Sequence, residues 1–239
     1  MGEDARLTAV ETAERTVVDL ASTPLRELNR RLHERSGPRR WLVLNPNGAH
    51  AVAAGLDTEL EVDVDGHVGY YCAGMNKLAT VHVHGNAGTG VAENMMSGRV
   101  VVDGSASQSA GATGRGGLLV VRGDASARCG ISMKGIDIVV RGSVGHMSAF
   151  MAQTGRLVVC GDAGEALGDS IYEARVYVAG DVASLGADCV EKEQRDEHVA
   201  ELRDLLERAG LDGVDPAGFR RYGSARQLYN FRVDNAGAY

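Results

Sequence analysis

Two histidines placed two positions apart are the residues whose types and spacing could most directly hold a metal ion. His82 and His84 stand in the segment Val81-His82-Val83-His84. On a strand they would share one face, which points away from the core formed by Val81 and Val83. A metal site needs more than two ligands, and no third ligand is evident at a neighbouring coil of the fold that the repeats predict. A solvated or partner-facing strand is therefore the favoured interpretation, and we predict no metal ligands.

Backbone amides in glycine-rich turns are a second group that could do chemistry, because such amides can hold an anion. No helix follows these glycines, so the strand, loop and helix context of a phosphate-binding or dinucleotide-binding site is missing. We expect glycine to act structurally, at tight corners and at positions with positive φ. His146 stands in the turn Gly145-His146-Met147-Ser148 and could contact a ligand or a partner. We predict no catalytic and no cofactor-binding residue.

Glycine recurs every 19 residues from Gly66 to Gly180, and we call these residues the repeat glycines. The fold that this repeat specifies must position all the side chains named above. A valine stands two residues before each repeat glycine and an aliphatic residue four before it, which is the alternation of a strand with one buried face. The period is too short for a helix-turn-helix unit or a propeller blade. The predicted fold is an all-β solenoid, a parallel β-helix of about seven coils. The repeat glycines are Gly66, Gly85, Gly104, Gly123, Gly142, Gly161 and Gly180.

Three regions are predicted, with the β-helix at residues 58–190 between two extensions. The N-terminal extension, residues 1–57, contains a short amphipathic helix that starts at Thr23-Pro24 and should end near Gly37-Pro38. The residues on its apolar face are Leu25, Leu28 and Leu32. A strand at 41–44 and a turn at 45–48 follow the helix.

The C-terminal region, residues 191–239, begins where the repeat ends. Position 199, where glycine would recur, is valine. Residues 191–209 predict a charged surface helix that ends at Gly210 and caps or leaves the rod. The apolar residues on one side of it are Val199, Leu202, Leu205 and Leu206. Residues 219–231 form an aromatic tail, packed on the rod or inserted into a partner.

An apolar stripe is expected on the outside of the rod, three residues before each repeat glycine. The residues at this position are Asp63, His82, Val101, Val120, Val139, Val158 and Tyr177. Proteins seldom leave such a patch exposed to water. Either the terminal segments of the chain or another subunit must cover it, and we favour another subunit.

Composition, charge and cysteine spacing exclude several classes of protein. The net charge is −7 and the chain contains only three lysines, so no nucleic-acid footprint is expected. There is no long apolar run and no signal peptide, which indicates a cytoplasmic chain without a membrane span. Cys72 and Cys129 occupy equivalent places three coils apart, too far for a disulfide. No cysteine pattern typical of a metal site is present, so all four cysteines are expected to be structural thiols.

Several runs in and after the coils are distinctive. They are GNAG at 85–88, GDAG at 161–164, GYYCAGMN at 69–76, ENMMSG at 93–98, RCGISMKG at 128–135, GHMSAFMAQ at 145–153 and YGSARQLYNF at 222–231. These runs resemble the GXGXG family, the right-handed β-helix found at the C-terminus of the large subunit of glutamate synthase. The likeness extends from about residue 25 to the C-terminus. The chain is most similar to a stand-alone version, the β-helix subunit of methylamine–glutamate N-methyltransferase (N-methylglutamate synthase).

This resemblance implies a multi-subunit enzyme in the cytoplasm. Its partners would be a class II glutamine amidotransferase-like subunit and an FMN-binding glutamate synthase-like subunit, in a larger hetero-oligomer. The complex would convert methylamine and glutamate into N-methylglutamate and ammonia, or perform a related reaction. FMN, and an iron–sulfur cluster if one is present, are expected on the partner, and no cofactor is expected on this chain alone. The chain would brace the other two subunits.

Two alternatives remain open at the level of sequence. In the first, the chain completes an active site through the turns that carry residues 93–96, 132–134 and 146–147. The sequence starts with Met1-Gly2 and has no N-terminal cysteine, which is the nucleophile of a class II amidotransferase. Glutamine amidotransferase activity would therefore lie elsewhere. In the second, the chain is a free-standing carbohydrate-acting β-helix, which would need paired acidic residues on stacked coils. Asp63 and Asp65 share a face on the first coil, but no acidic cluster is evident around them.

Overall fold

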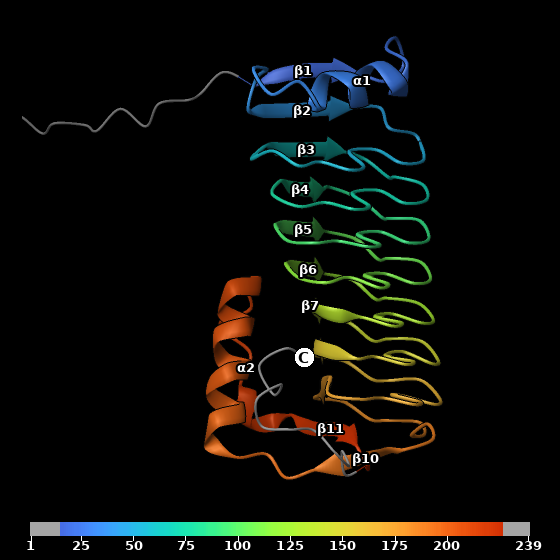
Figure 1. The fold of residues 1–239 in the computed structure, drawn as a ribbon, viewed down its shortest axis with the longest axis vertical. Helices are drawn as coiled ribbons and strands as arrows, with labels where there is room; N and C mark the ends of the chain where they lie inside the picture. The colour runs from blue at the N-terminus through green and yellow to red at the C-terminus, as the bar shows by residue number, and fades with distance from the viewer. Residues whose placement is uncertain (1–14, 227–239) are drawn as a thin grey trace, which may run out of the picture.

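The computed structural model describes residues 15–226, which form a rod of stacked coils (Figure 1). Strands β1 to β9 stack in chain order along the long axis, and β11 lies between β9 and β10. The strands are β1 (Thr16–Asp19), β2 (Arg40–Leu44), β3 (Glu61–Asp65), β4 (Thr80–Val83), β5 (Arg99–Val102), β6 (Leu118–Val121), β7 (Lys134–Val140), β8 (Thr154–Val159), β9 (Arg175–Val178), β10 (Cys189–Lys192) and β11 (Arg220–Ser224). The helices are α1 (Leu25–Leu32), α2 (Asp196–Ala209) and the short 3₁₀ helix η1 (Pro216–Gly218).

From β3 to β9 the parallel register equals the sequence period. Val62 pairs with Val81, Val81 with Val100, and each next strand repeats this step of 19 residues. A second ladder of single parallel bridges runs through the turns, beginning Val68 to Ala87 and ending at Val182. The inward valines of every strand are buried in one continuous core. The predicted all-β fold, a right-handed parallel β-helix of about seven coils, is confirmed.

The repeat glycines bring the backbones of successive coils together. The amide of Gly104 donates to the carbonyl of Gly85 at 3.0 Å, and that of Gly123 donates to Gly104 at 2.9 Å. A methyl group on Gly123 would lie 2.8 Å from the carbonyl of Gly104. Among the repeat glycines only Gly66 has a positive φ, 132°. Our expectation of positive φ is therefore wrong for the others, since the requirement there is close approach of two backbones.

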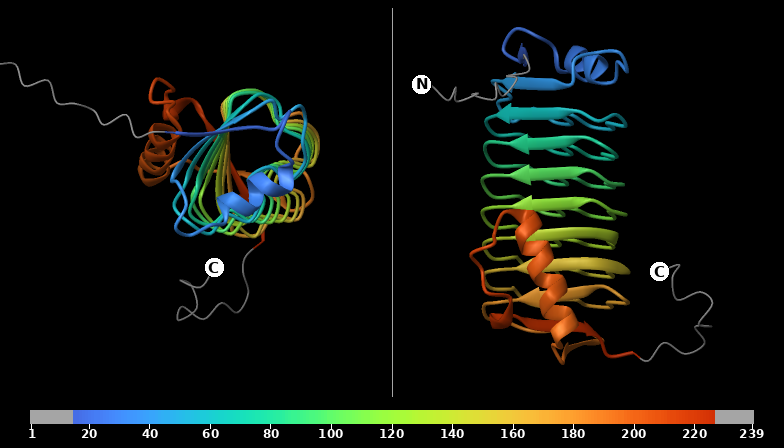
Figure 2. Two further views of the ribbon diagram at one scale, coloured as in Figure 1. Left: turned by 90° about the horizontal axis from the view of Figure 1, so that it is seen from above. Right: turned by 90° about the vertical axis from the view of Figure 1, so that its left-hand side faces the viewer.

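The N-terminal segment closes one end of the rod. Strand β2, which confirms the strand expected at 41–44, pairs in parallel with β3 and extends the sheet, and β1 adds one further strand. Helix α1 lies across this end (Figure 2), with Leu28 and Leu32 buried. The helix begins after Pro24 and ends at Leu32, earlier than predicted. The Asn29 amide contributes to holding it in place, because it donates to the carbonyl of Ala51 at 2.9 Å.

The apolar stripe on the outside of the rod is covered by the chain itself, so the preference for another subunit is wrong. Val120, Val139, Val158 and Tyr177 are fully buried in a second core, which they share with α2. Figure 2 shows α2 lying against the side of the C-terminal coils. The apolar side of α2 contributes Leu202, Leu205, Leu206 and Ala209 to this core. The helix neither caps the end of the rod nor leaves it, because its apolar side matches the stripe.

The C-terminal end of the rod is closed by an antiparallel turn of the chain. Strand β11 pairs antiparallel with both β9 and β10. This pairing makes residues 189–192 a strand, which is why α2 starts at Asp196 and not near 191. Tyr222 enters the main core and Phe219 the second core, so this part of the aromatic tail packs on the rod. Residues 227–231 of the tail lie outside the described residues. Within residues 15–226, no helix combines the length and apolar character needed to cross a membrane.

Replacing a repeat glycine should destabilise the rod. Gly123→Ala would place a methyl group against the Gly104 carbonyl and 2.6 Å from the Ser105 hydroxyl. We expect the free energy of unfolding to fall by about 1–3 kcal/mol, because backbone atoms cannot move aside. Urea unfolding followed by circular dichroism measures this. The control is Gly213→Ala, since a methyl group there meets no heavy atom within 4 Å. Equal stability of the two variants would contradict the close-approach explanation.

Removing a buried side chain of α2 should weaken the cover over the stripe. Leu202 is fully buried, so Leu202→Ala should lower the free energy of unfolding by about 2–5 kcal/mol. Arg203 is exposed on the same helix, and Arg203→Ala serves as the control with little expected effect. Thermal and urea unfolding of both variants give the comparison. An unchanged Leu202→Ala protein would mean that α2 does not dock on the stripe in solution.

Candidate functional site

The two histidines lie between two aspartates from the neighbouring coils. Asp63 of β3 pairs in register with His82 of β4, and Asp103 follows β5 at the position equivalent to His84. Nε2 of His84 lies 3.0 Å from Oδ1 of Asp63, and Nδ1 of His84 lies 3.0 Å from Oδ2 of Asp103. Nε2 of His82 lies 2.8 Å from Oδ1 of Asp103. We call these four residues the His–Asp cluster.

Charge and hydrogen bonding organise the His–Asp cluster. Arg122 donates to Oδ1 of Asp103 at 2.9 Å, and Arg15 lies 3.4 Å from Oδ2 of Asp63. Partial burial opposes ionisation of Asp103, but the hydrogen bonds from His82 and His84 lower its pKa below the ordinary value. Partial burial likewise favours the neutral ring of His84, yet its hydrogen bonds with both aspartates raise its pKa. The lowered pKa of Asp103 and the raised pKa of His84 both favour the charged form of this hydrogen-bonded pair.

Three members of the cluster form a donor set that could hold a metal ion. Ligand atoms from Asp63, His82 and His84 all lie within 4.8 Å of one another. The expectation that no third ligand lies at a neighbouring coil is therefore wrong. The signal was present in the sequence, because Asp63 precedes His82, and His84 precedes Asp103, by one full period of 19 residues. Such a separation places two side chains next to each other on adjacent strands.

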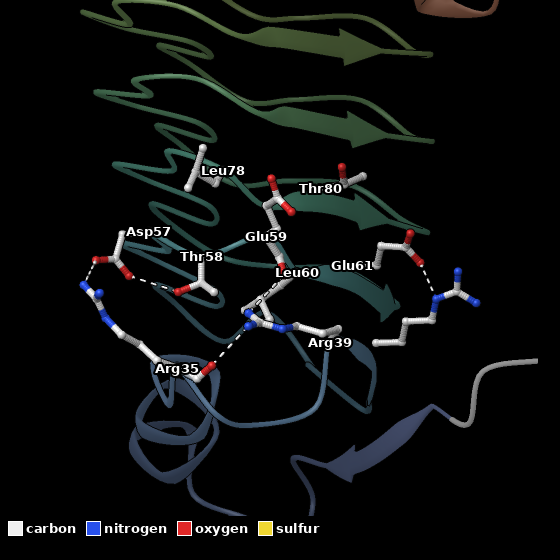
Figure 3. Close-up of a pocket in the computed structure, with 10 residues that line it drawn as sticks. Arg35, Arg39, Asp57, Thr58, Glu59, Leu60, Glu61, Leu78 and Thr80 are labelled. Carbon is white, nitrogen blue, oxygen red and sulfur yellow. Dashed lines mark hydrogen bonds and ion pairs between the residues drawn. The ribbon is translucent and has the colours of Figure 1, made fainter.

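A shallow groove lies beside the N-terminal coils (Figure 3). Its wall is polar: Arg35 lies 3.6 Å from Asp57, and Nε of Arg40 lies 3.0 Å from Glu61. Leu78 stands at its edge with about half of its surface exposed. Both arginines are therefore paired with acidic neighbours within the chain.

Large apolar side chains are exposed at one corner of the coils that follow β3 and β4. Met75, Leu78 and Met96 are each more than 40% exposed, at 48%, 51% and 41%. The amide of Met96 donates to the carbonyl of Asn76 at 2.7 Å, so the two coils bring these side chains to one place. We call Met75, Leu78 and Met96 the exposed corner. The exposed corner is thus an apolar surface that α2 does not cover.

The turns considered as possible active-site contributors do not present all their side chains to solvent. Met95 and Met133 are fully buried and fill the core. Glu93 and Lys134 are half-buried, whereas His146 is exposed on its turn. Residues 93 and 146 are nearly three coils apart, so strand spacing alone separates them by about 13 Å. The structure does not bring these residues together into one site.

All four cysteines are free thiols, as predicted. Cys72 and Cys129 are fully buried in the main core, and this burial raises the pKa of each thiol to about 12. Burial also raises the pKa of Cys160 and of Cys189 to about 11. A buried neutral thiol is a poor nucleophile and a poor metal ligand. The core thiols act as small apolar side chains.

The stacked coils and the covered stripe define this chain as a right-handed parallel β-helix protein. No family model matches the chain. It is 66% identical over 226 residues to Protein GlxC of Rhizobium meliloti (strain 1021), in a match that covers 93% of this chain and 99% of that protein. The chain therefore belongs to the GlxC family.

Burial of the core thiols predicts selective protection from alkylation. In the native protein at about pH 8, Cys72 and Cys129 should remain unmodified by a maleimide, because burial raises their pKa to about 12 and excludes the reagent. In denaturant all four cysteines should be modified. Peptide mass spectrometry reads each site separately. Rapid native modification of Cys129 would show that its coil opens readily.

Proposed function

We propose that this chain is the β-helix subunit of a multi-subunit glutamate synthase-like enzyme. In this role it braces a class II glutamine amidotransferase-like subunit against an FMN-binding synthase subunit. The amidotransferase-like subunit would carry the terminal cysteine nucleophile, and the synthase subunit would carry FMN and any iron–sulfur cluster. The finer proposal is the N-methylglutamate synthase reaction, in which methylamine and glutamate give N-methylglutamate and ammonia.

The sequence runs that resemble the glutamate synthase β-helix support this proposal. Their positions in the coils explain part of the likeness. Met95 and Met133 in two of these runs are core residues, and Cys72 and Cys129 pack in the same core. These residues therefore support a shared scaffold. Their burial also weighs against the alternative in which these turns supply catalytic side chains.

The exposed corner is the observation that carries the bracing role. The apolar stripe that first suggested a partner is covered by α2, so the surface left for a partner must lie elsewhere. Met75, Leu78 and Met96 provide one on consecutive coils. Leu78 also lines the polar groove of Figure 3. An apolar centre beside charged residues is the usual anatomy of a protein–protein interface. Each coil is tied to the next by backbone hydrogen bonds, which makes the rod a stiff spacer.

Affinity purification of a tagged chain from its native cell tests the proposal. We expect an amidotransferase-like chain and a synthase-like chain to co-purify, together with the visible absorbance of bound flavin. Glutamate and methylamine are then supplied to the purified complex, and N-methylglutamate is measured by mass spectrometry. Recovery of the chain alone, without flavin, would overturn the proposed function.

A pair of variants tests whether the exposed corner makes the contact. Met75→Asp should reduce recovery of the partner subunits by at least about tenfold, since a carboxylate would be buried in the interface. Arg203→Asp introduces the same side chain on the solvent face of α2 and should leave recovery unchanged. Thermal unfolding establishes that both variants are folded. Full recovery with Met75→Asp would place the contact on another surface.

A further inference from the structure

We propose that Asp63, His82 and His84 bind a divalent transition-metal ion, for which Zn²⁺ is the best fit, and that Asp103 orients the two histidines. The site lies on the outer face of β3 and β4. It does not depend on the function proposed above, since all four residues belong to this chain. Imidazole nitrogens with one carboxylate suit Zn²⁺ and its transition-metal neighbours, whereas Ca²⁺ and Mg²⁺ prefer oxygen ligands.

The ligand atoms have the spacing that one ion requires. Oδ1 of Asp63 lies 3.0 Å from Nε2 of His84 and 3.9 Å from Nδ1 of His82. Ligands at about 2.0–2.2 Å from a tetrahedral Zn²⁺ lie about 3.3 Å from each other, within this range. The two imidazole rings have centroids 4.0 Å apart and are tilted by 42°. One nitrogen of each ring lies within 4.8 Å of the other and of a carboxylate oxygen of Asp63. Small rotations of the side chains would complete three bonds.

Metal-binding histidines commonly donate the N–H that does not face the metal to a carboxylate, and Asp103 supplies that carboxylate here. The ring nitrogens that face away from Asp63 are Nε2 of His82 and Nδ1 of His84, and each hydrogen-bonds to Asp103, at 2.8 and 3.0 Å. A carboxylate in this place fixes the ring orientation and the tautomer. Arg122 in turn holds Asp103 at 2.9 Å. Arg15 approaches Oδ2 of Asp63, which leaves Oδ1 directed to the histidines.

The position of the site along the rod is an independent observation. The same outward position carries apolar residues from Val101 to Tyr177, and these pack with α2. The C-terminal part of α2 contacts β5, because Arg99 donates to the carbonyl of Arg208 at 2.6 Å. On the two preceding coils the position changes to Asp63 and His82, whose side chains are 21% and 27% exposed. The potential metal ligands Asp63 and His82 therefore take the place of apolar residues on the coils that α2 does not cover. A fourth coordination position would be open to water or to a partner.

Zinc titration of the full-length chain tests the proposal. The chain is purified without a polyhistidine tag, treated with a chelator and titrated with Zn²⁺ by calorimetry. We expect one Zn²⁺ per chain with a Kd in or below the micromolar range, and a rise in melting temperature upon binding. Asp63→Asn and His84→Gln should each weaken binding by at least about tenfold, and Asp103→Asn by about 10–100-fold. His146→Gln, a change at an exposed histidine on a distant turn, should bind as the wild type does.

Two results on the wild-type chain decide the matter even if a variant fails to fold. Zinc-edge X-ray absorption should show imidazole and oxygen ligands, whereas a sulfur shell would assign the ion to cysteines and overturn the proposal. Absence of Zn²⁺ binding at about 100 µM, well above about 1 µM for a working site, would also overturn it. A third result uses a variant: equal affinity of the wild type and a folded His82→Gln, His84→Gln double variant would overturn the proposal as well. The cluster would then be a hydrogen-bonded strand contact.

Discussion

The close approach of successive coils at the repeat glycines is the constraint on which the rest of the structure depends. From Gly104 to Gly180, each repeat-glycine amide donates to the carbonyl of the glycine 19 residues earlier, as Gly142 does to Gly123 at 3.0 Å. A side chain at this point would collide with the coil below. This ladder holds the register of the strand centres at 19 residues from β3 to β9. The pairing of β7 with β8 shifts register between Lys134 and Asp137, before it returns to the same step. No single coil buries enough surface to fold alone, so the ladder and the shared core form together.

A constant register converts positions in the repeat into columns on the surface. The position three residues before the glycine forms the apolar column under α2, and its first two members, Asp63 and His82, form half of the His–Asp cluster. One column thus performs two tasks, because the residues along it change where α2 ends. The turn positions form other columns, among them the exposed corner. A β-helix can therefore place separate surface functions on a scaffold that is constant from coil to coil.

Both proposals assign activity to surfaces and leave the interior structural. The interior is filled by valine, alanine and buried thiols, with Met95 and Met133 at the corners. At the two ends of the rod, Leu28 and Leu32 of α1 and Tyr222 of β11 are buried in the same core. A stiff, closed rod with an exposed apolar corner fits a subunit that holds other proteins apart at a fixed distance. An ion at the His–Asp cluster would add a contact point near the uncovered part of the outer face.

The sequence by itself determined the period, the strands, the buried face and the apolar stripe, because these follow from local alternation repeated at a constant interval. The pairing of Asp63 with His82 also follows from the sequence, because a strand register equal to the 19-residue period places them side by side. Only the tertiary structure decided what covers the stripe. The choice between α2 and a partner depends on where the chain turns after β10, and the antiparallel pairing of β11 with β9 and β10 sets that turn. Such contacts join residues far apart in the chain and leave no local pattern, so packing alone selects them.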